Sequence, residues 1–502
     1  MLSDGPLWLV FIRVSVLLLR SITPLCIFHV ILYLTGVAPI LRFHSIVLRI
    51  ELVTIPETLF YLLVYLPKRH VSQRPAPEGT ALSRDERQEL FDRCLASVPD
   101  IRLFLMTWFR GAPLAEIKKD NVREWLAWAF FHSYSTGPVD GQELDDYVSA
   151  TETVLGRKFE DGCGPYRPLR HSVDRINIQH RPLLYYICGV GLMDTLIFLK
   201  LWTLGFRHYA LSRWCQAFPY RPLSVFSKFR SPARDISYWY RPHTSKTRLP
   251  LLYIHGICAG LTTYTDFFKE IVAKDTGNPD NQVGILAVEI MPISFRLTSP
   301  ALTSREMVRQ INQILVLHGW DKRQFVLAGN SYGTIINTHL LRSPQVATNI
   351  ASVVLVDPVT LWVQMGDVAY NFTAKQPALA SEHQLHYFAC TDIGVAHTVT
   401  RRFVWTENVL WQDELKKVKA GLVVSGRDVI LNGPRLRRYI IDNQSEVEIS
   451  GLSATRGVEM IKAENLEVLY FKDLNHAQVF DFKKEQKLLV DMVWRHCTRA
   501  LI

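Results

Sequence analysis

Hydrophobic and polar positions follow different patterns in the two halves of the chain. In the N-terminal half apolar residues form long runs, and residues 22–41 are twenty positions without a formal charge, flanked by apolar stretches at 6–19 and 46–66. A helix of that length is enough to cross a hydrocarbon core of roughly 30 Å. The runs are too extended for a cleaved signal peptide, and no A-x-A site closes them. We therefore expect residues 1–70 to be a retained membrane-anchoring region, with buried helices of a soluble α domain as the alternative.

A second apolar segment, residues 183–206, is also long enough to span a membrane, but it contains Asp194 and Lys200. Charges in the middle of a bilayer are costly, so the pattern favours an interfacial or core helix over a span. Between the two apolar segments lies a polar stretch, residues 75–181, in which helical spacing at 83–95 and 121–131 predicts two helices. Residues 71–248 are therefore expected to form a mainly helical region.

Residues 207–248 combine many basic and aromatic side chains with a single acidic residue, Asp235. Basic groups are attracted to anionic lipid, and Trp and Tyr favour the membrane interface. Beside hydrophobic helices, an anionic lipid surface is the simplest interpretation, with a solvated linker as the alternative and nucleic acid as the weakest. The expected partners are therefore membrane lipids and not nucleic acid.

From residue 249 onward, short apolar runs alternate with helical spacing. We expect strands at 250–256, 283–290, 325–329, 352–358, 421–426 and 466–471, and helices at 304–317, 332–341 and 483–496. Alternating strands and helices predict an α/β fold with a mostly parallel sheet and helices on both faces. In such sheets the chemistry gathers beyond the carboxyl ends of the strands.

Composition and charge narrow the classes further. The 502 residues are 48% hydrophobic, which excludes a disordered chain, and the net charge of +10 suits an anionic surface. The eight cysteines show no C-x-x-C spacing and match no zinc site, so free thiols in a reducing compartment are expected.

The strongest chemical signal is the pentapeptide Gly329-Asn330-Ser331-Tyr332-Gly333, which follows an expected strand and opens an expected helix. That context is the one a nucleophile elbow requires, in which the serine takes a strained conformation on a sharp turn. The flanking glycines remove side chains that would clash, and the helix N-terminus supplies a positive dipole. A glycine-rich turn without chemistry is the alternative.

An earlier expected strand ends in His255-Gly256. The loop that follows can donate the backbone N–H of Ile257 to a developing oxyanion, together with the N–H of Tyr332. His255 is then a structural residue and not the base. A plain turn is the alternative for this loop.

A serine nucleophile needs an imidazole base, and a carboxylate must orient that imidazole. His476 lies after the last expected strand and before the final helix. Asp428 and Asp357 each follow an expected strand, and both carboxylates could reach the imidazole. Asp428 lies closer to the usual layout of such sites, which leaves Asp357 as the alternative acid.

With these features, residues from about 250 to 502 resemble the α/β-hydrolase superfamily, in particular serine esterases and lipases with an HG oxyanion loop and a G-x-S-x-G elbow. The resemblance implies a Ser331–His476–Asp428 triad, no metal or organic cofactor, and a helical cap at about 359–420, which is rich in aromatic residues. The loop lacks the HGGG form of many esterases. The hydrophobic N-terminal half resembles membrane-anchored hydrolases of fungi, on less specific features.

The resemblance implies hydrolysis of an apolar or lipid carboxylic ester through an acyl-enzyme on Ser331. Transfer of the acyl group to an alcohol by the same triad is one alternative, and a non-catalytic membrane scaffold with the same fold is another. The hydrophobic anchor predicts an intracellular membrane location, with the endoplasmic reticulum and the lipid-droplet surface as candidates.

Overall fold

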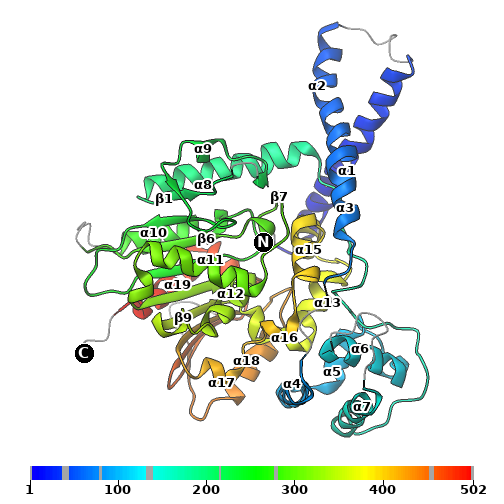
Figure 1. The fold of residues 1–502 in the computed structure, drawn as a ribbon, viewed down its shortest axis with the longest axis vertical. Helices are drawn as coiled ribbons and strands as arrows, with labels where there is room; N and C mark the ends of the chain where they lie inside the picture. The colour runs from blue at the N-terminus through cyan, green and yellow to red at the C-terminus, as the bar shows by residue number, and fades with distance from the viewer. Residues whose placement is uncertain are drawn as a thin grey trace.

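The structure is a computed structural model of the chain. It describes seven ranges, namely residues 3–36, 44–77, 82–131, 140–213, 216–275, 281–451 and 457–498. A large sheet with helices on both faces occupies the centre, a group of helices lies beside it, and two long helices project from the rest (Figure 1).

Within the described ranges, the central sheet has eleven strands in the order β11-β12-β13-β10-β9-β8-β5-β6-β4-β1-β3. Their bounds are β1 (Arg207–Ala210), β3 (Phe229–Arg230), β4 (Ser237–Arg241), β5 (Leu251–Ile254), β6 (Ile285–Glu289), β8 (Phe325–Asn330), β9 (Ile350–Val356), β10 (Lys419–Ser425), β11 (Glu448–Gly451), β12 (Val458–Ala463) and β13 (Leu466–Phe471). The six strands from β13 to β6 are parallel to one another. The predicted α/β fold with a mostly parallel sheet is therefore confirmed. Strands β2 (Ala217–Phe218) and β7 (Leu297–Thr298) form a separate small sheet.

The central strands are apolar on both faces because helices cover each face. In β5, for example, Leu252 packs into one core and Leu251 into the other, as strand alternation requires. The first core includes helices α11 (Ser304–Leu317) and α12 (Tyr332–Leu341), and the second includes α10 (Thr265–Ala273) and α19 (Lys483–His496). The predicted helices at 304–317, 332–341 and 483–496 coincide with α11, α12 and α19.

The sheet begins before the boundary expected at residue 249. Strand β4 pairs antiparallel with β6, and β1 pairs antiparallel with β4, so the basic and aromatic stretch contributes the edge of the sheet. Its aromatic rings pack within that edge, where Tyr209 stacks on Tyr238 with ring centroids 4.6 Å apart. This stretch is therefore more than a linker, because aromatic residues of its strands β1 and β4 pack into the two hydrophobic cores.

The expected cap lies between β9 and β10. Its helical elements are η11 (Val359–Leu361), η12 (Val363–Met365), α13 (Asp367–Thr373), α14 (Ala380–Leu385), the π-helical η13 (His386–Cys390), α15 (Ile393–Arg401), α16 (Trp405–Asn408) and α17 (Gln412–Leu415). Helix α18 (Gly433–Asp442) follows β10.

A group of N-terminal helices packs against this cap. It comprises α4 (Arg84–Ser97), α5 (Ile101–Trp108), α6 (Lys119–Phe131) and α7 (Gly141–Leu155). A capping box between Ser83 and Glu86 starts α4. Trp108 donates its indole N–H to the carbonyl of Gln364 at 3.0 Å, and the hydroxyl of Thr107 donates to that of Met365 at 2.7 Å. These bonds join the helical group to the cap in one continuous core.

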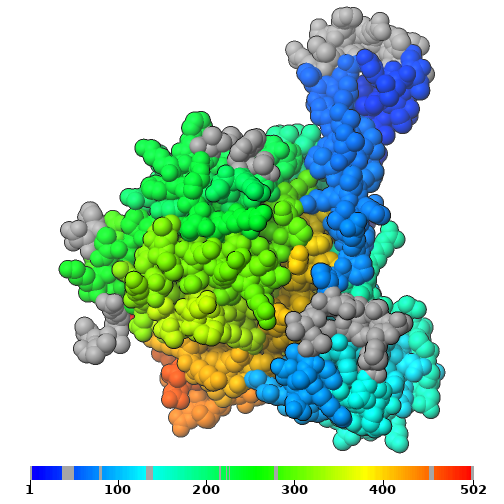
Figure 2. Space-filling model, viewed as in Figure 1, coloured from blue at the N-terminus to red at the C-terminus, as the bar shows by residue number. Residues whose placement is uncertain are grey.

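The projecting pair consists of α1 (Pro6–Leu34) and α2 (His44–Phe60), which continues through η2 (Tyr61–Tyr65) into α3 (Leu66–Ser72) (Figures 1 and 2). Three helices of the described residues are long and apolar enough to cross a membrane: Pro6–Leu34, Ile50–Ser72 and Tyr185–Thr203. The first begins well before the charge-free run expected at 22–41, and residues 37–41 of that run lie outside the described residues. Most of its large apolar side chains are exposed.

The third of these helices consists of η4 (Tyr185–Gly191) and α8 (Leu192–Thr203). Helix α8 contacts β1 and α10, and the short helix α9 (Pro222–Val225) also contacts β1.

Candidate active site

Ser331 stands on the sharp turn between β8 and α12. Its backbone has φ 52° and ψ −120°, a conformation that non-glycine residues rarely adopt and that surrounding structure must enforce. The backbone N–H of Ser331 donates to the carbonyl of Val356 at 2.9 Å, which ties the turn to the neighbouring strand. The predicted strand–elbow–helix context of Ser331 is thus present.

The three predicted glycines lie where backbone segments come too close for a side chain. A Cβ on Gly333 would lie 2.3 Å from the carbonyl oxygen of Ile254, and one on Gly256 would lie 2.9 Å from that of Asn330. A Cβ on Gly329 would lie 2.5 Å from the side-chain amide of Asn337. A side chain at any of these positions would push the neighbouring backbone or side chain away. The three glycines therefore allow the elbow and the HG loop to pack closely.

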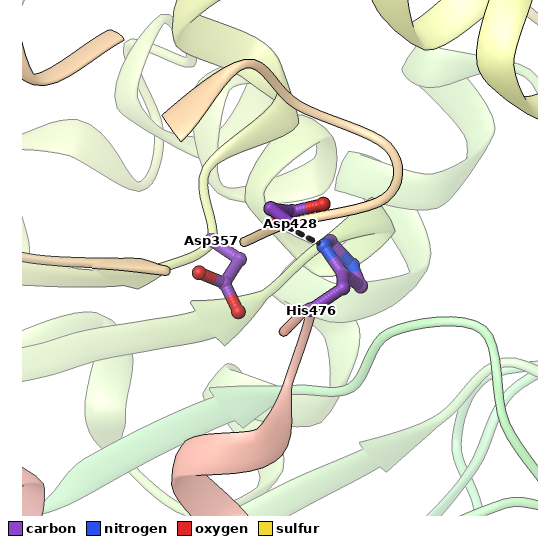
Figure 3. A group of neighbouring side chains, drawn as sticks. All are labelled: Asp357, Asp428 and His476. Atoms are coloured by element: carbon purple, nitrogen blue, oxygen red, sulfur yellow. Dashed lines mark hydrogen bonds and ion pairs between the residues drawn. The ribbon is translucent and has the colours of Figure 1, made fainter. Parts of the chain in front are cut away.

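The structure brings Ser331, His476 and Asp428 together in one line of hydrogen bonds. The Oγ of Ser331 lies 2.8 Å from Nε2 of His476. On the other side of the ring, Nδ1 of His476 lies 2.6 Å from Oδ2 of Asp428, as Figure 3 shows. His476 follows β13 and Asp428 follows β10, so all three side chains come from the carboxyl ends of parallel strands. Ser331 and His476 are buried. A proton on Nδ1 leaves the lone pair of Nε2 to accept the serine proton.

The charge of Asp428 sets the protonation of the imidazole. Burial lowers the pKa of His476, but the charge and the hydrogen bond of Asp428, helped by the charge of Asp357, raise it above its ordinary value. The other oxygen of Asp428 accepts the backbone N–H groups of Ile430 at 2.7 Å and Leu431 at 3.0 Å. The carboxylate is thereby fixed in the orientation that meets the imidazole.

Asp357, the alternative acid, lies next to this arrangement but holds backbone groups. Its two oxygens accept the N–H of Ser425 at 2.9 Å and the N–H of Ala477 at 2.6 Å. Complete burial and the nearby charge of Asp428 raise the pKa of Asp357 to about 6. Of the two carboxylates, Asp428 is the one bonded to His476 (Figure 3).

The carboxylates of Asp357 and Asp428 and the ring of His476 each offer an atom within 4.8 Å of the others, a spacing that a metal ion could bridge. The contacting atoms already have partners, however. Both imidazole nitrogens and both oxygens of Asp357 form hydrogen bonds. The cluster is therefore satisfied by protein groups without a cation.

The predicted oxyanion donors flank the serine. Tyr332 is the first residue of α12, and the first N–H groups of a helix have no partner within it. Ile257 lies in the HG loop and lines the same cavity as Ser331. His255 is fully buried and engages backbone on both sides: Nε2 accepts the N–H of Ile290 at 2.8 Å, and Nδ1 lies 2.6 Å from the carbonyl of Gly256. Burial lowers its pKa, so His255 shapes the loop as a neutral side chain.

Three polar residues that support the elbow, the HG loop and His476 were not predicted from the sequence. Tyr264 accepts the N–H of Gly256 at 3.0 Å and donates to Oδ1 of Asn330 at 2.8 Å, which joins the HG loop to the elbow. Asn475 accepts the N–H of Val429 at 3.1 Å and that of His476 at 2.7 Å. Asn330 and Asn475 adjoin Ser331 and His476 in the sequence, and that adjacency is the signal that could have found them.

A cavity of about 200 Å³ opens onto Ser331 and His476. The cap supplies a largely apolar wall to it, made by Phe372, Leu385, Phe388 and Ala389 together with the polar Gln384. The loop after the HG motif supplies another side through Cys258, Thr263 and Tyr264. A larger cavity of about 710 Å³ lies between α4, α17 and α18, and no predicted site residue lines it. Of these two cavities, only the smaller one would place a bound molecule next to Ser331 and His476.

No protein-family model matches the sequence, and no curated protein matches it. Solved structures similar to the chain include a membrane phospholipase A described as a bacterial virulence factor, at 13% identity and a TM-score of 0.37, covering 62% of this chain and 94% of that one. Naproxen esterase from Bacillus subtilis is 13% identical with a TM-score of 0.36, covering 61% and 98%. An esterase from Thermogutta terrifontis is 12% identical with a TM-score of 0.34, covering 52% and 95%. The chain itself has the α/β fold with a mostly parallel sheet that its sequence predicts.

Proposed function

We propose that the chain is a membrane-associated serine hydrolase that cleaves an apolar or lipid carboxylic ester. The observation that carries this proposal is the continuous line of hydrogen bonds from Ser331 through His476 to Asp428, at 2.8 and 2.6 Å. A strained serine at a strand–helix elbow beside an oriented imidazole is the arrangement that acyl transfer to a hydroxyl nucleophile requires.

In the first half of the reaction, Oγ of Ser331 attacks the acyl carbon while Nε2 of His476 takes the serine proton. The negative charge that develops on the carbonyl oxygen is stabilised by the backbone N–H groups of Tyr332 and Ile257. Collapse of the tetrahedral intermediate expels the alcohol, which receives the proton from His476. Asp428 holds the imidazole and stabilises its charged form.

In the second half, His476 removes a proton from water, which attacks the acyl group on Ser331. Collapse of the second intermediate releases the carboxylic acid and returns the proton to Ser331. Neither half needs a metal or an organic cofactor, because the imidazole moves every proton and backbone groups bind the oxyanion.

The substrate class follows from the surroundings of the serine. Four of the five cap residues that line the cavity are apolar, which suits an acyl chain or another hydrophobic group. The exposed apolar side chains of α1 and α2 favour a membrane next to the site, where lipid esters concentrate.

The test is hydrolysis of a series of carboxylic esters of increasing acyl length by the full chain in detergent. We expect acid release that disappears in Ser331→Ala and His476→Ala. Ser299→Ala, which alters an exposed serine remote in sequence from the elbow, is the matched control and should keep full activity. Activity that persists in Ser331→Ala, or a folded wild type inactive on every ester, would refute the proposal.

A further inference from the structure

The helix formed by η4 and α8 is apolar and long enough to cross a membrane. Ion pairs of its residue Asp194 nevertheless anchor it to the domain that contains the central sheet. Asp194 in α8 pairs with Arg296 at 2.8 Å and with Arg221 at 2.9 Å, and the two arginine side chains are only 4% and 8% exposed. Arg221 also forms a double hydrogen bond to the buried Glu289 at the end of β6. A bilayer core would offer Asp194 no such partners.

The same side of α8 packs into the hydrophobic core of the domain. Ile197 and Leu201 are buried in the core that also contains Trp239 of β4 and helix α10. The ring of Phe198 contacts that of Trp239 with centroids 5.0 Å apart. A helix covered by protein along one side is not surrounded by lipid, so η4–α8 is docked on the domain along its length.

The opposite side of this helix is apolar and exposed. Its exposed large side chains are Leu184, Ile187, Leu192, Met193, Leu196, Leu199 and Trp202. They recur mostly at spacings of three to five residues, which places them on one outward stripe of a helix. Phe226, directly after α9, is 79% exposed, and both α8 and α9 contact β1. An apolar surface of this extent marks contact with lipid or protein.

Exposed basic side chains lie on or next to elements that adjoin this helix, since α8 and α9 both contact β1 and β3 pairs with β1. Arg207, Arg213, Lys228 and Arg230 are exposed around β1, α9 and β3, and none of them forms an ion pair with an acidic side chain in the part of the chain that the structure describes. Exposed cations that have no carboxylate partner on the elements next to an apolar stripe complement the headgroups of an anionic lipid layer. The charge therefore favours a lipid surface over a protein partner.

The helix also adjoins both sides of the cavity at Ser331. On one side, Tyr185 of η4 contacts Phe388 of the cap with ring centroids 6.1 Å apart, and Phe388 lines the cavity. On the other side, α8 contacts the short helix η6 (Thr262–Tyr264), of which Thr263 and Tyr264 line the cavity. A lipid layer on the outer stripe would lie next to both walls of the cavity.

We propose that η4–α8 does not cross the membrane but lies flat on one leaflet of an anionic phospholipid bilayer, and that this leaflet supplies the ester to Ser331 between Phe388 and residues 258–264. The second half of this proposal rests on the proposed hydrolase function. The first half concerns the position of the helix and stands independently of any activity.

The position is tested by measuring depth in the bilayer. Ile187→Cys and Leu199→Cys are each labelled with a nitroxide in the full chain carrying Cys163→Ser, Cys188→Ser and Cys215→Ser, with that parent as the blank. The chain is reconstituted in vesicles of phosphatidylcholine and phosphatidylglycerol, and depth is read from collisional relaxation by oxygen and a nickel chelate. Twelve residues correspond to about 18 Å along a helix at 1.5 Å per residue. We expect both labels at the same shallow depth.

Depths that differ by about 18 Å would show a spanning helix, and labels in water at both positions would show no membrane contact; either result overturns the proposal. Leu317→Cys, at an exposed position of α11 away from the stripe, is the matched control and should report water.

Delivery from the leaflet is tested with the double variant Leu196→Asp/Leu199→Asp. We expect the ratio of turnover on a long-chain ester in vesicles to turnover on a soluble short-chain ester to fall at least about tenfold, since two apolar side chains no longer enter the lipid. Leu317→Asp should leave the ratio unchanged. An unchanged ratio in the double variant refutes delivery. A wild type inactive on both esters refutes the proposed function, while the depth measurement still decides the position of the helix.

Discussion

Asp357 accepts the backbone N–H of Ala477 at 2.6 Å and so holds the residue that follows His476. Both residues have positive φ, 44° for Asp357 and 59° for Ala477. The two carboxylates near the imidazole therefore have different roles: Asp428 forms a hydrogen bond with the ring of His476, and Asp357 fixes the backbone next to His476. Strain at both positions indicates that the surrounding structure enforces this geometry.

This division predicts different effects for the two amide variants. Asp428→Asn should lower kcat by about 10³–10⁴-fold, because the imidazole loses its orienting charge and correct tautomer. Asp357→Asn should lower it by about 10–100-fold, the effect of a small misplacement of His476. Steady-state kinetics on one ester checks both values. If Asp357→Asn were the more damaging change, Asp357 and not Asp428 would be the acid.

The pH dependence of kcat/KM follows from the raised pKa of His476. The base works only when neutral, so activity should rise with pH through an apparent pKa above 6.5, the ordinary value for histidine. Asp357→Asn removes a negative charge that raises this pKa and should move the acid limb to lower pH. The profiles are measured with a soluble ester between pH 5 and 9. An acid limb that moves to higher pH in the variant would contradict the electrostatic explanation.

The buried ion pairs of α8 predict a stability effect remote from the serine. Asp194→Asn leaves Arg296 buried without a carboxylate and should lower the free energy of unfolding by about 3–5 kcal/mol. Asp266→Asn is the control, because its pair with Lys200 is exposed and 3.8 Å long, and such pairs contribute at most about 1 kcal/mol. Denaturant unfolding in detergent, followed by tryptophan fluorescence, compares the two. Equal effects would show that the buried pair does not anchor α8.

The apolar cap wall predicts the acyl preference. Leu385→Trp fills part of the cavity of about 200 Å³ and should lower kcat/KM for long-chain esters at least tenfold more than for an acetate ester. Leu379→Trp, at an exposed position just before α14, is the control and should change neither. The measurement is kcat/KM across an acyl series. A uniform loss on all esters would place the acyl chain elsewhere.

The elements that carry the site could be predicted because each one is continuous in the sequence. The strand expected at 466–471 coincides with β13, and the helix expected at 332–341 coincides with α12. Ser331, Asp428 and His476 follow apolar strand patterns directly, so the sequence places them at strand ends. The structure places them in one hydrogen-bonded line.

The edge of the sheet could not be predicted in the same way, because its buried basic side chains form ion pairs with acidic residues remote in sequence. In the sequence, Arg221 cannot be distinguished from the other basic residues of this stretch. In the structure it is buried and forms an ion pair with Glu289, 68 positions further on. The available signal is the run of aromatic residues in β4, since Tyr and Trp favour strands. Whether Asp357 or Asp428 meets the imidazole also depends on side-chain direction, which periodicity does not encode.

The most direct test of the account is covalent labelling by a fluorophosphonate probe, which reacts with activated serines. The full chain in detergent is compared with Ser331→Ala, His476→Ala and the control Ser299→Ala, each shown to be folded by its unfolding curve. We expect the probe to label the wild type and Ser299→Ala, and to label neither Ser331→Ala nor His476→Ala. Labelling that persists in Ser331→Ala, or a folded wild type that does not react, would contradict the claim that Ser331 is the nucleophile.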